Sequence, residues 1–203
     1  GGAVFAAHIA ARYGLDKVLS FDMGGTTAKI CLIQNQTPKT SRVFEVARSY
    51  RFKKGSGMPI SIPVIDMVEI GAGGGSLAHV DTLRQIRVGP ESAGSEPGPA
   101  CYGRGGTRPA VTDADLVLGK LDGKNFAGGS ITLDEDAARA AVKSTLGDPL
   151  ELDAQTAAFG LAEVVDENMA NAARVHAVEN GEDLADYTMI AFGGAAPLHA
   201  ARL

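Results

Sequence analysis

The sequence predicts an α/β fold, and three features of the chain carry that prediction. Two apolar runs rich in β-forming residues flank a glycine turn between Val18 and Ile33. A long segment from Asp153 to Asn180 repeats apolar residues at three- and four-residue steps, as a helix does. A compact apolar run, Tyr187 to Phe192, leads through two glycines into a further helix. The 203 residues suffice to bury the core of one domain.

The composition excludes several classes of protein. The formal net charge is −5, and the chain has no basic block of the kind that a nucleic-acid surface needs. Its one basic cluster, Arg51, Lys53 and Lys54, is expected at a solvated strand end. No apolar run reaches the roughly 18 residues of a membrane span. Two cysteines without metal-ligand spacing indicate a reduced, cytoplasmic setting.

The first half of the chain reads as a helix followed by extended segments. Residues 3–13 place apolar side chains near one face of a helix, and Gly14 stands where a helix commonly ends. The segment 18–33 is predicted to form a β-hairpin. Residues 40–52 alternate as a further strand does, and apolar residues continue through a prolonged extended segment over 60–70.

The turn of the hairpin has the composition of a phosphate-binding site. Gly24 and Gly25 let backbone N–H groups approach an anion, since no side chain stands in the way. The hydroxyls of Thr26 and Thr27 are potential donors to phosphate oxygens, and Asp22 is a potential ligand of hydrated Mg²⁺. The alternative is an ordinary hairpin turn in which Asp22 only caps the backbone.

A second glycine cluster, Gly71 to Ser76, has five glycines in six positions. Each glycine costs about 1 kcal/mol relative to alanine in a helix, so regular structure does not explain the cluster. It is either a flexible loop or a place where another backbone or a ligand comes close. The flanking Glu69, His79 and Asp81 are candidate metal ligands or acid–base groups, although their spacing matches no specific pattern.

The segment 89–112 is predicted to be a long loop that must be pinned, because uncommitted loops of this length are rare in compact domains. Cys101 within it is either a nucleophile or a packed structural residue, and no activating neighbour identifies a thiolate. Thr112 is expected to cap a short helix over 113–121. Asp134 is expected to start another helix, which Gly147 and Pro149 stop.

The end of the chain holds the second candidate binding turn. The strand at 187–192 runs into Gly193, Gly194 and Ala195, and a helix follows from about Pro197. Small residues at such a turn let a flat or bulky ligand lie against the backbone. Close packing of the strand on the helix is the alternative explanation for them.

Several stretches, taken together and in order, resemble the hydantoinase A, 5-oxoprolinase and acetone carboxylase β-subunit family. They are FDMGGTTAK (21–29), VEIGAGGGSLAHVD (68–81), VGPESAGSEPGPACYGRGG (88–106), TDADLVLGKL (112–121) and AFGGAAPLHA (191–200). The first also resembles the phosphate loop of the actin, sugar kinase and heat-shock chaperone superfamily. The resemblance implies an RNase-H-like α/β fold with a glycine-rich insertion. It implies a single hydantoinase A-type ATP-binding domain over 1–203, part of a longer parent chain, with the loop-rich insertion over 55–130.

The resemblance also implies a function, an ATP- and Mg²⁺-dependent enzyme in which ATP phosphorylates an amide or carbonyl oxygen. The expected enzyme is a cyclic amidohydrolase of the N-methylhydantoinase or 5-oxoprolinase type. The alternatives are the β subunit of a ketone carboxylase and a non-catalytic nucleotide-binding or assembly module. Expected partners are an N-terminal domain of the parent chain, a second catalytic subunit or domain, and a small cyclic amide or ketone, without nucleic acid or membrane.

By the same resemblance, individual residues receive roles. Asp22 is the expected metal ligand and catalytic residue. The expected nucleotide-binding residues are Gly24, Gly25, Thr26, Thr27 and Lys29 on the phosphate side, and Gly193, Gly194 and Ala195 on the adenosine side. Lys29 stands where most family members have an acidic residue, so it would either bind phosphate directly or face solvent.

Overall fold

The computed structural model describes residues 1–47, 49 and 55–203 of the chain. These residues form a mixed α/β fold, which confirms the predicted class. The chain divides into two compact units, here called the sheet unit and the cleft unit. The sheet unit comprises Gly1–Asp22, Lys29–Glu69 and Ala170–Phe192, and the cleft unit comprises Met23–Ala28, Ile70–Met169 and Gly193–Leu203.

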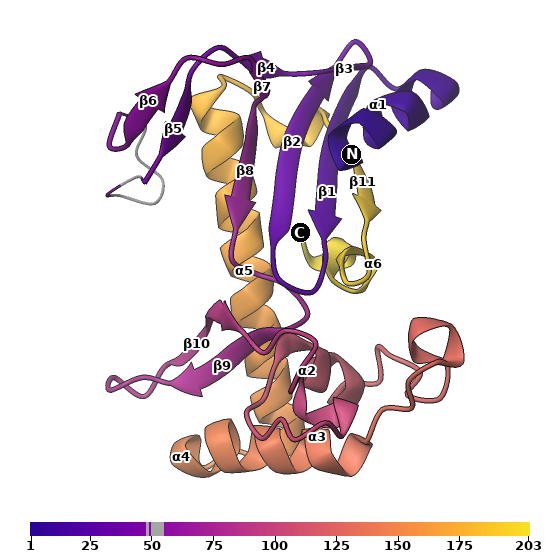
Figure 1. The fold of residues 1–203 in the computed structure, drawn as a ribbon, viewed down its shortest axis with the longest axis vertical. Coiled ribbons are helices and arrows are strands. Elements are labelled where there is room, and N and C mark those ends of the chain that lie inside the picture. The colour runs from indigo at the N-terminus through magenta and orange to yellow at the C-terminus, as the bar shows by residue number, and fades with distance from the viewer. Residues whose placement is uncertain (48, 50–54) are drawn as a thin grey trace. The chain divides into compact units, whose positions relative to one another are not determined.

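The sheet unit is built on the predicted hairpin, β1 (Lys17–Met23) and β2 (Ala28–Gln34). The strand order is β11-β1-β2-β3, and β8 (Met67–Ile70) also pairs with β2. β11 (Thr188–Phe192) runs parallel to β1, with Val18 opposite Thr188, whereas β3 (Thr37–Pro38) runs antiparallel to β2. Figure 1 shows β1 and β2 as neighbouring arrows of opposite direction. The hairpin prediction is therefore confirmed.

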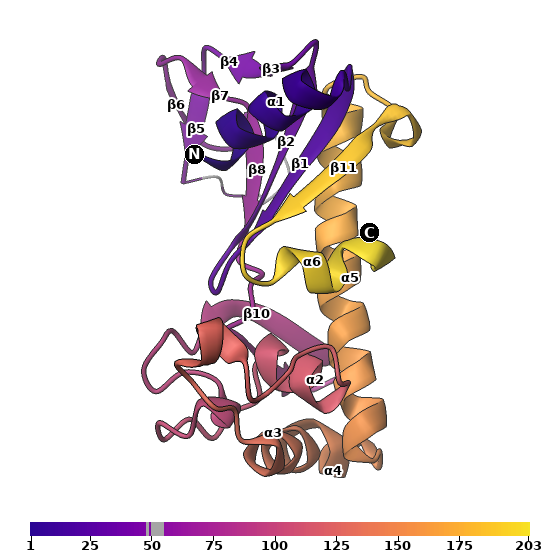
Figure 2. The ribbon, with the colours of Figure 1, turned by 90° about the vertical axis from the view of Figure 1, so that its right-hand side faces the viewer.

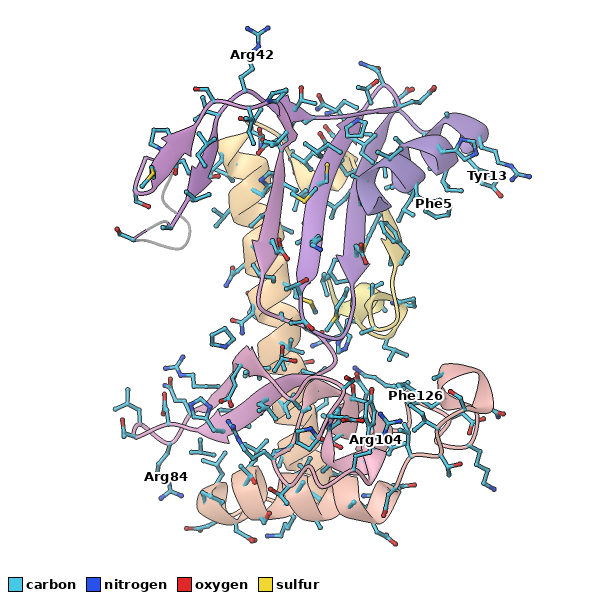
Figure 3. The ribbon with its side chains drawn as sticks, in the orientation of Figure 1. Phe5, Tyr13, Arg42, Arg84, Arg104 and Phe126 are labelled. Atoms are coloured by element: carbon cyan, nitrogen blue, oxygen red, sulfur yellow. The ribbon has the colours of Figure 1, made fainter. Side chains whose placement is uncertain are left out.

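Helix α1 (Gly2–Tyr13) ends at Gly14 in the left-handed conformation, as predicted. Its alanines at three- and four-residue steps are buried against Val18, Cys31 and Ile33 of the hairpin. Within the sheet unit, the sheet lies between α1 and the C-terminal part of α5 (Figure 2). On the other face of α1, Phe5 and Tyr13 are exposed, although Phe5 meets the ring of Phe192 edge-on at 6.0 Å (Figure 3).

The segment between β3 and β8 forms short strand pairs. β4 (Thr40–Ser41) pairs with β7 (Val64–Ile65), and β5 (Phe44–Val46) pairs with β6 (Met58–Ile60). The predicted strand over 40–52 is thus two short strands as far as residue 47, and its remainder lies largely outside the described residues, as does the basic cluster of Arg51, Lys53 and Lys54. The prediction of one prolonged extended segment over 60–70 is wrong, because the segment is interrupted. The backbone turns at Ile62, whose N–H donates to the Ile60 carbonyl.

The cleft unit contains the antiparallel pair β9 (Ser76–Val80) and β10 (Ile86–Ser92), four α-helices that lie wholly within it, and the first part of α5. The helices are α2 (Val111–Val117), α3 (Glu135–Val142), α4 (Asp148–Leu150) and α6 (Ala196–His199). α5 (Ala154–Glu179) is the predicted long helix, and it ends before Gly181. Its first part, up to Met169, belongs to the cleft unit.

One predicted helix end in this unit is wrong. Asp134 caps α3 as expected, since its carboxylate accepts the N–H of Ala137 at 2.9 Å. However, Gly147 and Pro149 do not stop the helix. The helix widens to a π-turn over Lys143–Gly147. Pro149 then lies in the first turn of α4, a position where proline is tolerated because a backbone N–H is not needed there. The left-handed Glu151 ends the helix instead.

Within the described part of the chain, no helix combines the length and the apolar character that crossing a bilayer requires.

Candidate nucleotide and substrate cleft

The glycine turn between β1 and β2 is the centre of a backbone framework in the cleft unit. Gly24 closes the turn by donating its N–H to the Thr27 carbonyl at 3.1 Å. The second glycine cluster runs directly against it. Gly74 donates to the Gly24 carbonyl at 2.9 Å and Gly75 to the Gly25 carbonyl at 2.7 Å. The cluster is therefore a place of close backbone approach, one of the two alternatives that the sequence left open.

Helix α2 is tied to the same framework through Thr112. Both the N–H and the hydroxyl of Thr112 donate to the Gly74 carbonyl, each at 2.8 Å. The expectation that Thr112 caps the helix is wrong, because the helix begins one residue earlier, at Val111. Its first turn is closed by the buried carboxylate of Asp113, which accepts the N–H of Ala110 at 2.8 Å.

Asp113 also pins the predicted long loop. Its carboxylate accepts the N–H of Cys101 at 2.7 Å and that of Ala100 at 3.1 Å. Cys101 itself is fully buried, and burial beside Asp113 raises the pKa of its thiol. A thiol so protected is a poor nucleophile, which supports the packed structural role.

The turn after β11 joins the framework on a third side. Gly193 has a φ of 94°, a conformation that favours glycine, and Ala195 then donates its N–H to the Met23 carbonyl at 3.0 Å. The two turns that the sequence singled out, 22–27 and 193–195, are thus hydrogen-bonded to one another through their backbones.

These segments surround a cleft of about 840 Å³, and every residue that lines it belongs to the cleft unit. One side is backbone and hydroxyl, from Gly24, Gly25, Thr26, Gly74, Gly75 and Thr112. Apolar or aromatic side chains of the lining come from Tyr102, Leu121, Phe126 and Leu198, and Asp122 and Asn125 line the cleft as well. The arrangement suits a ligand with an anionic or polar part and an apolar part.

Two aromatic residues, Tyr102 and Phe126, are among those that line the cleft. The ring centroids of Tyr102 and Phe126 lie 5.7 Å apart, and the Arg104 guanidinium lies 5.9 Å from the Tyr102 centroid. Figure 3 shows the labelled Arg104 and Phe126 on loops of the same unit. A flat ligand would be able to stack on one of these rings, with the Arg104 guanidinium nearby.

Six of the glycines in or beside the cleft fall into two groups. A Cβ atom on Gly73, Gly74 or Gly75 would lie between 2.6 and 2.9 Å from a neighbouring atom, so packing requires glycine there. A Cβ on Gly24, Gly25 or Gly194 would meet nothing within 4 Å, and none of these three has a positive φ. Neither packing nor conformation within the described structure accounts for glycine at these cleft-lining positions, whereas close approach of a ligand to the backbone would.

A buried cluster of two carboxylates and an imidazole adjoins the cleft through Asp115. His199 on α6 is fully buried, and its Nδ1 lies 2.7 Å from Asp166 Oδ1 on α5. Its Nε2 lies 3.1 Å from Asp115 Oδ2 on α2, and Asp115 lines the cleft. Burial lowers the pKa of His199, but the hydrogen bonds to Asp115 and Asp166 outweigh it and raise that pKa to about 9. His199 is therefore a cation at neutral pH, held between the side chains of Asp115 and Asp166.

The structure brings most of the predicted site residues to this cleft. Gly24, Gly25, Thr26, Gly194 and Ala195 line it, and Thr27 and Gly193 adjoin these residues in the chain. The remaining two predicted residues, Asp22 and Lys29, belong to the sheet unit, and each has a neighbour there.

Asp22 lies at the start of α1, where a Cβ added to Gly2 would be 2.9 Å from its Oδ2. A carboxylate at a helix N-terminus is favourable without a metal. Lys29 is exposed and pairs with Glu69, their charged atoms being 3.7 Å apart.

The alternative metal candidates do not assemble. Among the described residues, no group of three His, Cys, Asp or Glu side chains is arranged to hold a metal ion. Glu69 contacts Lys29, and Asp81 accepts a hydrogen bond from Arg87 at 2.7 Å. The N–H of Gln85, followed by the bond from Arg87 and the N–H of Leu83, lowers the pKa of Asp81, as expected for a carboxylate that closes a turn.

The sequence analysis missed Asp115, Asp166 and His199 as a group. Asp115 and Asp166 lie 84 and 33 positions from His199, so no local sequence pattern predicts the contacts of either carboxylate with His199. The one available signal was that Asp115 and His199 both fall within the stretches, 112–121 and 191–200, that carry the family resemblance.

Comparison with known proteins agrees with that resemblance. Residues 1–203 match the Hydantoinase/oxoprolinase family over their whole length. The chain is 42% identical to the uncharacterised protein MJ0964 of Methanocaldococcus jannaschii, over 100% of the chain and 30% of that protein. It is 40% identical to the caprolactamase α subunit of Pseudomonas jessenii, over 96% of the chain and 27% of that protein.

Two solved structures have the same fold. The crystal structure of the ATP-dependent caprolactamase of Pseudomonas jessenii matches with a TM-score of 0.82 and 38% identity, over 99% of this chain and 28% of that one. The nucleotide-free structure of acetone carboxylase matches with a TM-score of 0.84 and 28% identity, over 98% of this chain and 27% of that one. The chain spans less than a third of the length of the curated relatives named here. With its full length matched by the family profile, the chain belongs to the hydantoinase/oxoprolinase family.

Proposed function

We propose that the chain is the ATP-binding part of an ATP-dependent cyclic amidohydrolase. The observation that carries the proposal is the group of cleft-lining glycines, Gly24, Gly25 and Gly194, at which the protein itself has no need of glycine. Phosphate bound by backbone N–H groups needs that close approach. The caprolactamase of Pseudomonas jessenii, to which the chain is 38% identical in structure comparison, is described as ATP-dependent.

In this proposal the fold is the RNase-H-like one, with the glycine-rich segment within 55–130 as an insertion into a single nucleotide-binding domain. Gly24, Gly25, Thr26 and Thr27 hold phosphate oxygens, and Gly193, Gly194 and Ala195 flank the adenosine. Lys29 supplies positive charge, which its exposed and weak pairing with Glu69 leaves available.

Mg²⁺ fits the residues present only in part. Asp22 is the one carboxylate beside the glycine turn in the sequence, so it would hold the ion through water. ATP supplies a phosphoryl group that makes an amide or carbonyl oxygen a better leaving group. The chain's own residues would bind, orient and exclude water, which is most of what phosphoryl transfer needs from a protein.

A ketone carboxylase subunit is the second candidate, favoured by the match to acetone carboxylase over 98% of the chain. The same nucleotide chemistry would then activate a ketone or bicarbonate. A third candidate is a module that binds nucleotide without turning it over. Because the relatives are about three times longer, we propose that an N-terminal domain and a second catalytic subunit or domain complete the site.

The first test is calorimetric titration of Mg-ATP into the full-length protein that carries this chain. We expect binding in the wild type, and at least tenfold weaker binding in Gly25→Val, whose side chain would enter the cleft. Ala140→Val on the exposed face of α3 is the matched control and should bind as the wild type does. Wild-type protein that does not bind Mg-ATP would end the proposal.

Product analysis separates the three candidates. The full-length protein, with its partner subunit, is incubated with ATP and with caprolactam, 5-oxoproline or acetone, each with and without bicarbonate. Lactam-dependent ADP release indicates the amidohydrolase, and bicarbonate-dependent consumption of acetone indicates the carboxylase. ATP binding without ADP release on any of them would favour the binding module.

A further inference from the structure

The loop that follows α2 supplies three of the residues that line the cleft, Asp122, Asn125 and Phe126. It folds around Asp122, whose Oδ1 accepts the N–H of Lys124 at 2.9 Å. The Asp122 carbonyl accepts the N–H of Asn125 at 3.2 Å, which closes the turn. The side chains of Asp122 and Asn125 are therefore held on one short turn at the cleft.

The side-chain amide of Asn125 has a defined orientation. Its Nδ2 donates a hydrogen bond to Asp122 Oδ2. That bond, followed by the N–H of Lys124, lowers the pKa of Asp122, so the carboxylate is ionised at neutral pH. An ionised carboxylate only accepts hydrogen bonds, so the amide nitrogen of Asn125, and not its oxygen, must face Asp122. The amide therefore presents its oxygen, Oδ1, as an acceptor.

The Asn125 Oδ1 atom belongs to an exposed side chain in the cleft lining, so a ligand can reach it. In the described part of the chain, the hydrogen bonds of Asn125 are made by its Nδ2 and its backbone N–H. Oδ1 is thus left to water or to a ligand. A ligand with an N–H donor at this point would replace a water molecule with a hydrogen bond of its own.

Two aromatic rings accompany this amide in the cleft lining. Phe126 follows Asn125 directly in the chain, and its ring centroid lies 5.7 Å from that of Tyr102 at an interplanar angle of 48° (Figure 3). Both residues are half-buried. The Tyr102 ring packs on Gly98, where an added Cβ would lie 2.6 Å from Cδ2 of the ring. Packed aromatic rings that remain partly open are a common surface for the stacking of nucleotide bases.

The amide, the rings and the glycine turn line one and the same cleft. Gly24, Gly25 and Thr26 belong to its lining together with Asn125 and Phe126. Its volume of about 840 Å³ lies within the roughly 300 to 1,000 Å³ of small-molecule sites. The cleft is therefore compatible with one ligand that has phosphate at the glycine turn and a flat ring at Phe126.

We propose that Asn125 Oδ1 accepts a hydrogen bond from the exocyclic amino group of an adenine base that stacks on Phe126 and Tyr102, with Asp122 as the positioning residue. The choice of a nucleotide rests on the proposed function, whereas the orientation of the amide does not. Adenine fits because its amino group is a donor on the edge of a flat ring. Asn125 thereby selects adenine nucleotides for the cleft.

The test compares three probes with the full-length protein that carries this chain. They are ATP, purine riboside triphosphate, which lacks only the amino group, and tripolyphosphate, which lacks the nucleoside. Dissociation constants are measured by calorimetry with Mg²⁺ present. We expect ATP to bind about tenfold more tightly than purine riboside triphosphate, as the loss of one hydrogen bond implies. Asn125→Ala should remove most of that preference, and Asn171→Ala, at an exposed position of α5, should keep it.

The positioning residue and the rings have readouts of their own. Asp122→Asn offers a donor as well as an acceptor to the Asn125 amide, which is then free to turn. This variant should lose much of the preference for ATP and keep its affinity for purine riboside triphosphate within about threefold. A merely structural defect would weaken both nucleotides alike. Phe126→Ala should weaken both nucleotides by similar factors and leave tripolyphosphate binding unchanged.

The outcomes separate this proposal from the nucleotide function. Equal affinity of ATP and purine riboside triphosphate in the wild type, or an unchanged preference in Asn125→Ala, would overturn the role of Asn125 while ATP binding stands. ATP that binds no more tightly than tripolyphosphate would show that the base makes no contact, and would overturn it as well. Wild-type protein that does not bind ATP would overturn both.

Discussion

A Cβ atom on Gly73 would lie 2.6 Å from the backbone nitrogen of Thr26, so the second glycine loop and the first glycine turn touch backbone to backbone. In the same turn, a Cβ atom on Gly24 or Gly25 would meet no atom within 4 Å. This difference separates glycines that the fold requires from glycines that a ligand would require.

The first prediction uses that difference. Gly73→Ala should lower the free energy of unfolding by about 1 to 3 kcal/mol, because the added methyl group overlaps fixed backbone. Gly25→Ala should leave it unchanged or raise it by roughly 0.4 to 1 kcal/mol through the unfolded chain. Urea denaturation followed by circular dichroism measures both. Equal destabilisation by the two variants would contradict the assignment.

The second prediction concerns Thr112. Thr112→Val removes the hydroxyl that donates to the Gly74 carbonyl and nearly keeps its shape, so it should cost about 1 kcal/mol of stability. Thr132→Val, at an exposed loop position, is the matched control. If the two variants have the same midpoint of urea denaturation, the Thr112 hydroxyl does not hold α2 to the glycine loop.

The third prediction follows from the raised pKa of His199. Its ordinary pKa is 6.5 and its folded value is about 9, so its stabilising contribution is complete below pH 6.5 and is lost as the pH rises through about 9. The shift corresponds to roughly 3 kcal/mol. Unfolding free energies measured between pH 6 and 9.5 should therefore fall across this range.

In His199→Gln that fall should be much smaller, since the variant has no group that titrates there between Asp115 and Asp166. An equally steep decline in the variant would assign the pH dependence to other groups. Asp166→Asn, which removes one of the two carboxylates, should flatten the profile in part.

The fourth prediction concerns the two cysteines, which are both free and buried. Burial raises the pKa of Cys31 to about 12, with Asp66 adding to the effect, and it raises the pKa of Cys101 as well. In the folded protein at pH 8, neither thiol should react with iodoacetamide on the time scale of minutes. Mass spectrometry should find both thiols alkylated in 6 M urea. Rapid labelling of Cys101 without urea would instead support the alternative that Cys101 is a nucleophile.

Local patterns in the sequence predicted those elements whose formation depends on neighbours in the chain. The hairpin around Gly24, helix α1 with its end at Gly14, and the long helix from Ala154 all have periodicities that span several turns or strand residues. The start of α2 did not follow its local signal. Thr112 has the side chain of a cap residue, but the fold uses its hydroxyl for Gly74, 38 positions away.

The candidate site was predictable only on its backbone side. Glycines in a turn indicate that a ligand or another backbone comes close, so the sequence alone singled out Gly24, Gly25 and Gly194 as candidate binding residues. Asp115 and His199 have no common pattern, because their contact arises where α2 and α6 pack in three dimensions. Tyr102 and Phe126 likewise come together from two loops whose course the sequence leaves open.

The peptide group of Gly74 has an evolutionary consequence. It donates to Gly24, accepts twice from Thr112, and leaves no room for a side chain. Substitution at position 74 or 112 is therefore constrained by the other. Among relatives, residues 74 and 112 should be inherited together, and a lineage that replaces the threonine hydroxyl should show compensating change in the loop that it holds.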